Sequence, residues 1–344
     1  ASAEYDTVIA EWIRQVDFDV IHIRHIGWHS LSLPRIAQSM GKPVVFSFHD
    51  FYALCPTVKL VDDQGKYCGG NCTTGEGRCK VQLWPEDSLP SLKHNWVNVW
   101  RTKMAKSLEE CDAFVTTSTS ARDTILAQLP GIDPDRFTVI PHGRNFPKFA
   151  RLRTFPNRAQ PVKILVPGNI DVSKGLDIIY QLLDHDVLGV LEFHILGNIG
   201  QTGRAAHPRL TWHGSYSREE FLDKVASVLP QFGAIFSIWD ETYCHTLTEL
   251  WSAGVPALVF DFPTVAGRVR ASGAGWVLPH DDISELYDRI VALAFDREEQ
   301  RRVDDAIETW QEGEGRSNST RMMAASYLDV YRDARNRRRT ITHG

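Results

Sequence analysis

A loop containing glycine and lysine is the first segment of this sequence that could bind a charged ligand. The stretch GNIDVSKGLDII begins at Gly168, directly after the apolar run PVKILVP, and Lys174 and Gly175 stand where a helix is predicted to start. Helix-start amides and a nearby ammonium both stabilise a diphosphate, whose negative charge grows when a bond to it breaks. The same residues also describe a tight strand-to-helix connection that binds nothing, so both interpretations stay open.

Two glutamates form the second candidate. Glu241 follows the apolar run FGAIFSIW, and Glu249 comes after seven intervening residues, within a predicted helix. A carboxylate can accept two hydroxyl hydrogen bonds at once, which suits a ribose diol or a sugar ring. The alternative is that Glu241 caps a turn and Glu249 is solvated. Gly254 and Pro256 predict a tight exit from this helix into another strand beside the same pocket, which favours binding.

His49 and Asp50 are the third candidate, because they directly follow the predicted buried strand GKPVVFSF. A neutral histidine there can donate to a sugar oxygen, and Asp50 can orient it or cap a turn. A purely structural histidine is the competing interpretation.

Four of the six cysteines lie in one glycine-rich stretch, CPTVKLVDDQGKYCGGNCTTGEGRC. Cys55, Cys68, Cys72 and Cys79 could close a tetrahedral structural zinc site, remain free thiols or form disulfides. A site with four sulfur ligands has no open position, so even the zinc interpretation predicts a fastening for the loop and no catalytic metal.

Strands and helices alternate along the chain, which predicts an α/β fold with parallel sheets covered on both faces. Helices are expected at about 28–40 and 88–110, and residues 145–160 are expected to form an irregular linker. We expect an N-terminal domain over 1–150 and a second domain over 151–310. A C-terminal helix over 311–344 should pack back toward the first domain and end in a basic tail. Two such domains should place a ligand crevice between them.

The composition is that of an ordinary folded protein, with 344 residues, 43% hydrophobic residues and a formal net charge of -5. This charge disfavours general binding to nucleic acid. The basic run at 335–339 is either a solvated tail or a weak contact with an anionic membrane surface. No stretch approaches the ~20 apolar residues of a membrane span, so we expect a cytoplasmic protein that can be peripheral on the inner face of the membrane.

Taken together and in this order, the motifs resemble those of family 4 glycosyltransferases, in the subgroup that builds bacterial cell-surface saccharides. The shared signature is the loop with Gly168, Lys174 and Gly175, then Glu241 and Glu249, then Gly254 and Pro256. HDFYALCP, ETYCHTLTELWSAGVP, GRVRASGAGWVLP and PHG are also similar to subgroup patterns. The resemblance implies a GT-B fold, in which two Rossmann-like domains face a cleft.

The resemblance also implies roles for individual residues. Lys174 would contact the diphosphate of a nucleotide-sugar co-substrate, Glu249 the ribose, and Glu241 the hexose hydroxyls. His49 would lie beside the donor sugar at the reacting face. The remaining donor-binding residues would be Gly168, Asn169, Gly175, Tyr243, Cys244, His245 and Thr246. Transfer to a glycan or a lipid-linked acceptor would be retaining and would use no catalytic metal.

The sequence departs from the family in two places. Asn169 stands where many members carry an arginine, and Arg268 or Arg204 could replace that charge. The opening strand and glycine-rich loop of the family are missing before DVIH, which shortens the N-terminal domain. The chain is therefore a truncated or processed piece, or a neighbouring polypeptide completes the sheet, or the acceptor binds differently.

Two other functions compete with glycosyl transfer. A nucleotide-sugar epimerase of the same fold would need carboxylates and histidines set for attack on released intermediates, and no distinctive sign of these is found. A non-catalytic nucleotide-sugar-binding module of a larger assembly is favoured by Asn169 and the missing strand. The retention of Lys174, Glu241, Glu249 and His49 argues against it, and Glu249→Ala is expected to abolish the donor response while leaving the fold nearly unchanged.

Overall fold

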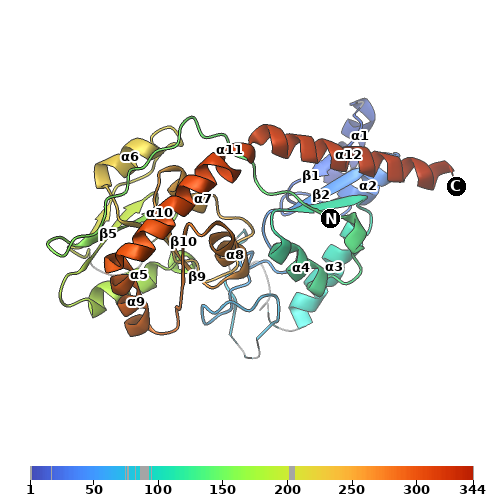
Figure 1. Cartoon of the computed structure of the whole chain (residues 1–344). Coiled ribbons are helices and arrows are strands. Elements are labelled where there is room, and N and C mark those ends of the chain that lie inside the picture. Colours follow the sequence, from blue (N-terminus) through green and yellow to red (C-terminus); the bar gives the residue numbers. More distant parts are fainter. Residues whose placement is uncertain are drawn as a thin grey trace. The chain divides into compact units, whose positions relative to one another are not determined.

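The computed structural model describes residues 2–16, 18–73, 75, 77–81, 83–85, 93, 95–200 and 206–343. The chain divides into two compact units (Figure 1). Unit 1 comprises Ala1–Gly143, Trp239–Tyr243 and Thr320–Gly344, and unit 2 comprises Arg144–Ile238 and Cys244–Ser319. Each unit is built around a parallel sheet.

Unit 1 contains a sheet in the strand order β1-β2-β3-β4, with every neighbouring pair parallel. Its elements are α1 (Ala3–Gln15), β1 (Ile21–Ile23), α2 (Leu33–Ser39), β2 (Val44–Phe48), α3 (Asn95–Leu108), β3 (Ala113–Thr116), α4 (Thr119–Gln128), η2 (Pro134–Arg136), β4 (Phe137–Val139) and α12 (Thr320–His343).

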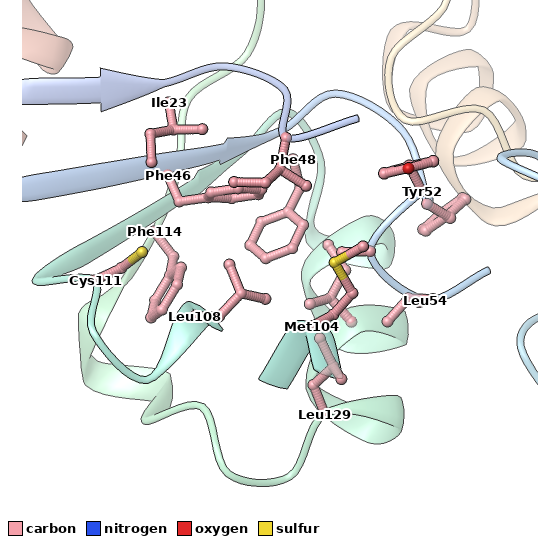
Figure 2. Close-up of a cluster of buried hydrophobic side chains, with 14 of the residues drawn as sticks. Ile23, Phe46, Phe48, Tyr52, Leu54, Met104, Leu108, Cys111, Phe114 and Leu129 are labelled. Carbon is pink, nitrogen blue, oxygen red and sulfur yellow. The ribbon is translucent and has the colours of Figure 1, made fainter. Parts of the chain in front are cut away.

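The two faces of this sheet bury different side chains, because successive residues of a strand point to opposite faces. Phe46, Phe48 and Phe114 belong to the cluster shown in Figure 2, together with Met104 and Leu108 of α3. On the other face, buried side chains of β2 and β3 pack against α12; these are Val45, Ala113 and Val115 with Tyr327, Val330 and Ala334. Helix α12 is therefore part of the core of unit 1.

Unit 2 contains a parallel sheet in the order β10-β9-β8-β5-β6-β7. Its elements are β5 (Val162–Pro167), η3 (Val172–Lys174), α5 (Leu176–His185), β6 (Leu191–Leu196), β7 (Leu210–Trp212), α6 (Phe221–Val228), β8 (Phe232–Ile235), α7 (His245–Ser252), β9 (Ala257–Phe260), α8 (Pro263–Ser272), β10 (Gly275–Leu278), α9 (Ile283–Phe295), α10 (Arg297–Glu312) and α11 (Glu314–Ser317). One hydrophobic cluster joins the sheet to α5 and α9, and another joins it to α6, α7, α8 and α10.

The strand order of unit 2 reverses at β5, which lies between β6 and β8. From β5 the chain continues outward to β6 and β7, and then returns to β8 on the other side of β5. In open parallel sheets the crevice at such a reversal, beyond the carboxyl ends of the strands, is where ligands bind. The segments that follow β5 and β8 are therefore the candidate ligand-binding segments of unit 2.

The alternation of strands and helices agrees with the sequence-based prediction, whereas some boundaries differ. The helix predicted at about 28–40 begins only at Leu33. The helix predicted at 88–110 is described from Asn95 to Leu108 as α3, and most of its predicted first turns lie outside the described residues. Residues 145–160 form no helix or strand, yet they lie along unit 2, since the backbone N–H groups of Ala150 and Leu152 donate to the carbonyls of Ser252 and Ala253.

Arg335 and Arg337 near the C-terminus stay exposed, as predicted for a solvated tail, whereas Arg338 is largely covered by unit 1. Arg337 donates to the backbone carbonyl of Asp135, and Arg338 donates to that of Gln38. Arg335 forms an ion pair with Asp19 over 3.3 Å. Three arginines of this basic run therefore contact backbone carbonyls or an acidic side chain of the same unit.

Candidate functional site

In unit 2, the loop after β5 is a tight strand-to-helix connection capped by Asp171. The Asp171 carboxylate accepts hydrogen bonds from the Lys174 backbone N–H at 3.1 Å and the Ser173 hydroxyl at 2.6 Å. Gly175 adopts a left-handed conformation (φ 81°), and a Cβ added there would lie 2.4 Å from the Phe236 carbonyl oxygen. Only glycine fits this close approach, so the chain turns sharply and presents Lys174 directly before α5.

The same loop lies next to the start of α7, which follows β8. A Cβ built on Gly168 would lie 3.3 Å from the Thr246 side chain. The Asn169 side chain does not point freely from the loop, because its oxygen accepts a hydrogen bond from Asn198 at 2.9 Å. Gly168 and Thr246 are therefore brought together at the strand-order reversal.

Cys244 carries local backbone strain where α7 begins. Its φ of 72° lies in the left-handed region, which costs a residue with a Cβ about 1–2 kcal/mol. Its carbonyl accepts a hydrogen bond from Arg268 at 3.1 Å, and its sulfur lies 3.3 Å from the Thr246 hydroxyl. Such outliers persist where the surroundings determine the conformation, and they concentrate at ligand-binding segments. Arg268 is thus positioned by α7, whereas Arg204 lies outside the described residues.

Glu249 is buried and both of its carboxylate oxygens have partners within unit 2. Arg144 reaches one oxygen at 2.6 Å, and the Tyr216 hydroxyl donates to the other at 2.7 Å. The side chains of Arg144 and Glu249 are only 10% and 8% exposed. Sequence reasoning missed Arg144 and Tyr216; the only signal was that Arg144 directly follows the PHG motif.

Residues 239–243 are anchored on unit 1, although their neighbours in the sequence belong to unit 2. The Thr242 hydroxyl donates to the His49 carbonyl at 2.7 Å, and the Tyr243 hydroxyl donates to the His142 carbonyl at 2.8 Å. Glu241, between these anchored residues and Trp239 in the core, is 6% exposed. The structure therefore brings Glu241 and Tyr243 to the segments that carry His49 and His142.

His49 has the properties of a neutral hydrogen-bonding group. Its ring stacks on His142 with centroids 5.5 Å apart, and His142 meets the edge of Tyr243. Burial, followed by the nearby positive charge of Arg24, lowers the pKa of His49 to about 4. Its Nε2 atom is buried without a hydrogen-bond partner among the described residues. Asp50 does not orient it, because its carboxylate accepts from the Tyr52 N–H and faces His25.

The histidines of unit 1 predict a stability loss in acid. The pKa values of His22 and His49 are each lowered to about 4, chiefly by burial, against an ordinary value of 6.5. Between these pH values the unfolded chain binds more protons, so the free energy of unfolding falls as the pH drops from about 6.5 toward 4, by on the order of 1–3 kcal/mol for each histidine. Urea unfolding at pH 7 and pH 4.5 measures this loss of stability. Between the two pH values, the free energy of unfolding should fall less for His49→Asn than for the wild type. Equal losses in both proteins would show that His49 does not contribute.

The predicted cysteine cluster also comes together in the structure. Cys55, Cys68, Cys72 and Cys79 line one cavity of about 20 Å³ in unit 1, and none of the four forms a disulfide. Among the described residues, no group of three or more His, Cys, Asp or Glu side chains is already arranged to hold a metal ion. No helix in the described ranges is long and apolar enough to cross a membrane.

The comparisons with known proteins agree with the predicted family and fold. The sequence model described as Glycosyltransferase Family 4 matches residues 3–146, which confirms the predicted resemblance over this part of the chain. This match ends before Gly168, so it says nothing of the individual donor-binding residues. No curated protein sequence matches the chain significantly.

Solved structures resemble this chain over nearly its whole length. Anabaena Alr3699/HepE in complex with UDP aligns at 11% identity with a TM-score of 0.63, covering 94% of this chain and 81% of that one. A glycosyltransferase from Rickettsia africae ESF-5 aligns at 14% identity with a TM-score of 0.62, covering 96% of this chain and 80% of that one. Sucrose-phosphate synthase from Thermosynechococcus elongatus aligns at 12% identity with a TM-score of 0.64, covering 96% of this chain and 77% of that one. At such identities the likeness establishes the fold, which is the predicted GT-B type.

Proposed function

We propose that this chain, which matches family 4 over residues 3–146 and has the GT-B fold, is a retaining glycosyltransferase that uses a nucleoside-diphosphate sugar. The observation that carries this proposal is the meeting of the Gly168 loop with the start of α7, at the strand-order reversal of unit 2. A rigid glycine turn, a lysine and the beginning of a helix there suit a diphosphate.

The donor-binding roles are assigned to unit 2. Lys174 and the amides around Cys244, His245 and Thr246 bind the diphosphate, with Gly168, Asn169 and Gly175 shaping the loop. Glu249 binds the ribose hydroxyls through lone pairs that Arg144 and Tyr216 leave available, since each carboxylate oxygen can accept more than one hydrogen bond. We therefore propose residues 151–310 as the donor-binding domain and residues 1–150 as the acceptor-side domain.

The reacting groups are assigned to unit 1. Glu241 and Tyr243 contact the hexose, and neutral His49 donates a hydrogen bond to a sugar oxygen. In the transfer, the bond from the anomeric carbon to the diphosphate breaks and a bond to the acceptor oxygen forms on the same face. The acceptor proton passes to the departing diphosphate, so no nucleophilic side chain and no catalytic metal are required. The protein contributes positioning and charge stabilisation.

We further propose a glycan or lipid-linked acceptor in cell-surface polysaccharide synthesis, at the inner face of the membrane. UDP-sugars are the first donors to test, because the similar Anabaena protein was solved with UDP, with UDP and glucose, and with UDP-glucose. A binding module without activity is the second candidate. Two observations favour it. Asn169 stands where many family members carry an arginine, and its side chain accepts a hydrogen bond from Asn198. Glu249 already has Arg144 and Tyr216 as partners of its carboxylate.

A panel of UDP-, GDP-, ADP- and TDP-sugars separates the two candidates. We expect one donor class to raise the melting temperature and to be hydrolysed slowly without acceptor, with no requirement for an added divalent metal. Stabilisation without any hydrolysis or transfer would favour the binding module. A chain that responds to none of the donors, while remaining folded, would refute both.

A further inference from the structure

The loop after β2 carries four cysteines, a residue type that binds metal ions. Cys55, Cys68, Cys72 and Cys79 surround one small cavity together with the side chain of Arg101. The cavity of about 20 Å³ has room for roughly one water-sized sphere. A single ion is therefore the largest occupant that it could take without expanding.

This loop has little regular structure of its own to hold it. Over residues 49–73 the described backbone forms no helix or strand, and its only ladder contact is an isolated bridge between Val61 and Tyr67. Val58 and Leu60 have φ values of 65° and 55°, in the left-handed region that is costly for residues with a Cβ. A long strained loop of this kind needs a fastening, and long loops without secondary structure are uncommon otherwise.

The backbone presents the cysteines to one another from separate arms of the loop. Gly69 and Gly70, with φ values of 57° and 86°, turn the chain tightly between Cys68 and Cys72. The three-residue spacing of this pair falls within the range found in structural zinc sites. The Cys68 N–H donates to the Leu60 carbonyl at 2.8 Å, and the Cys55 N–H donates to the Phe51 carbonyl at 3.0 Å. Each arm is thus fixed by backbone hydrogen bonds.

Arg101 provides an independent indication that negative charge belongs in this cavity. Its guanidinium donates to the carbonyls of Leu54 and Gly70 at 3.1 and 2.5 Å, and to the side-chain oxygen of Gln128 at 2.5 Å. In the described part of the chain these bonds all go to neutral oxygens. Arg101 is only partly buried, but even partial removal of its charge from water is unfavourable without a carboxylate partner. Four thiolates around a divalent ion carry two net negative charges, and Arg101 offsets part of that charge.

We propose that Cys55, Cys68, Cys72 and Cys79 bind one zinc ion in a structural site. Among the described residues no such group is yet arranged to hold an ion, because the Cys68 thiol donates to the Leu60 carbonyl over 3.1 Å; metal binding requires this side chain to turn from the carbonyl toward the cavity that it lines. The four thiols release their protons to solvent, and the ion has no open position for catalysis. It fastens the loop that begins at His49, where the Phe51 N–H donates to the Val58 carbonyl.

The first test measures the metal directly in the full-length chain, purified with reductant and without added metal. Elemental analysis should find one zinc per chain, and replacement by Co²⁺ should give the thiolate-to-cobalt absorption of a tetrahedral four-sulfur site. Thiol alkylation of the native protein, mapped by peptide, should spare Cys55, Cys68, Cys72 and Cys79 until a chelator is added, whereas the buried Cys111 and Cys244 should not respond to the chelator. Absence of zinc with four freely alkylated thiols, or disulfides among these cysteines by mass spectrometry, would overturn the proposal.

Variants supply the matched control. Cys68→Ser and Cys79→Ser should each weaken zinc binding by more than about tenfold. Loss of a residue that only hydrogen-bonds to a metal ligand already weakens binding about tenfold, and loss of the ligand itself should weaken it more. Cys111→Ala, which changes a fully buried cysteine of unit 1 outside the cluster, should keep one zinc. Wild-type zinc content in Cys68→Ser would contradict the site, and the wild-type measurements decide the question if a variant does not fold. The donor panel addresses unit 2 separately, so its failure leaves this test intact.

Discussion

Glu249→Ala lowers the free energy of unfolding of unit 2 by about 3–5 kcal/mol and abolishes donor-induced stabilisation. The first effect follows because Arg144, only 10% exposed, loses the carboxylate that lies 2.6 Å away. Removing one partner of a buried ion pair leaves an uncompensated charge, which costs this amount. Urea unfolding followed by tryptophan fluorescence measures it, since Trp251 lies buried on the same helix. The structure thus changes the expectation from sequence that the fold would be nearly unaffected.

A double variant separates the two roles of Glu249. Arg144→Met with Glu249→Leu removes both charges, so it should recover most of the lost stability without recovering the donor response. Tyr216→Phe is the milder control, because it removes one hydrogen bond worth about 1 kcal/mol. If Glu249→Ala unfolds at the wild-type urea concentration, the pair with Arg144 does not stabilise the unit. If it keeps the wild-type donor response, the ribose role is wrong.

Lys174→Met should lower turnover by about 10²–10³-fold, the loss typical when one stabilising donor to a developing anion is removed. Lys174 is part-exposed, and its backbone N–H remains bonded to Asp171 in the variant. The free energy of unfolding should therefore change little. Steady-state transfer or slow donor hydrolysis, with the best donor of the panel, gives the turnover.

Lys224→Met is the matched control for Lys174→Met, because it removes the same charge from unit 2 at helix α6. It should retain wild-type turnover. If the two variants lose equal activity, the effect is one of net charge and the assigned contact with the diphosphate fails. If Lys174→Met unfolds at a lower urea concentration than Lys224→Met by a wide margin, its lost activity reports on folding instead.

The regular elements were predictable because their signals are local. The apolar run PVKILVP predicts a strand, and β5 lies there. The glycine that follows the run indicates the turn that leads into α5. Ser118 caps α4, because its side chain accepts from the Ala121 N–H, and a serine directly before a helix is also a local signal. Spacing along the chain carries this information directly, since strand and helix periodicities extend over only a few residues.

The partners of the site residues were not predictable, because they depend on contacts between distant segments. Nothing near Glu249 in the sequence indicates Arg144, which lies more than a hundred residues before it. The docking of Thr242 and Tyr243 on unit 1 likewise depends on His49 and His142. The charge of the basic run predicts exposure, which Arg337 shows, but it does not reveal the carbonyls of Asp135 and Gln38 that Arg337 and Arg338 contact.

The packing of α12 on β2 and β3 affects how the chain can fold while it is being synthesised. Val45 and Val115 emerge from the ribosome long before Tyr327 and Val330, which cover them. At roughly 5–20 residues per second, that delay is on the order of ten to sixty seconds. During this time one apolar face of the nascent sheet stays uncovered, so newly made chains should depend on chaperones until α12 has been synthesised.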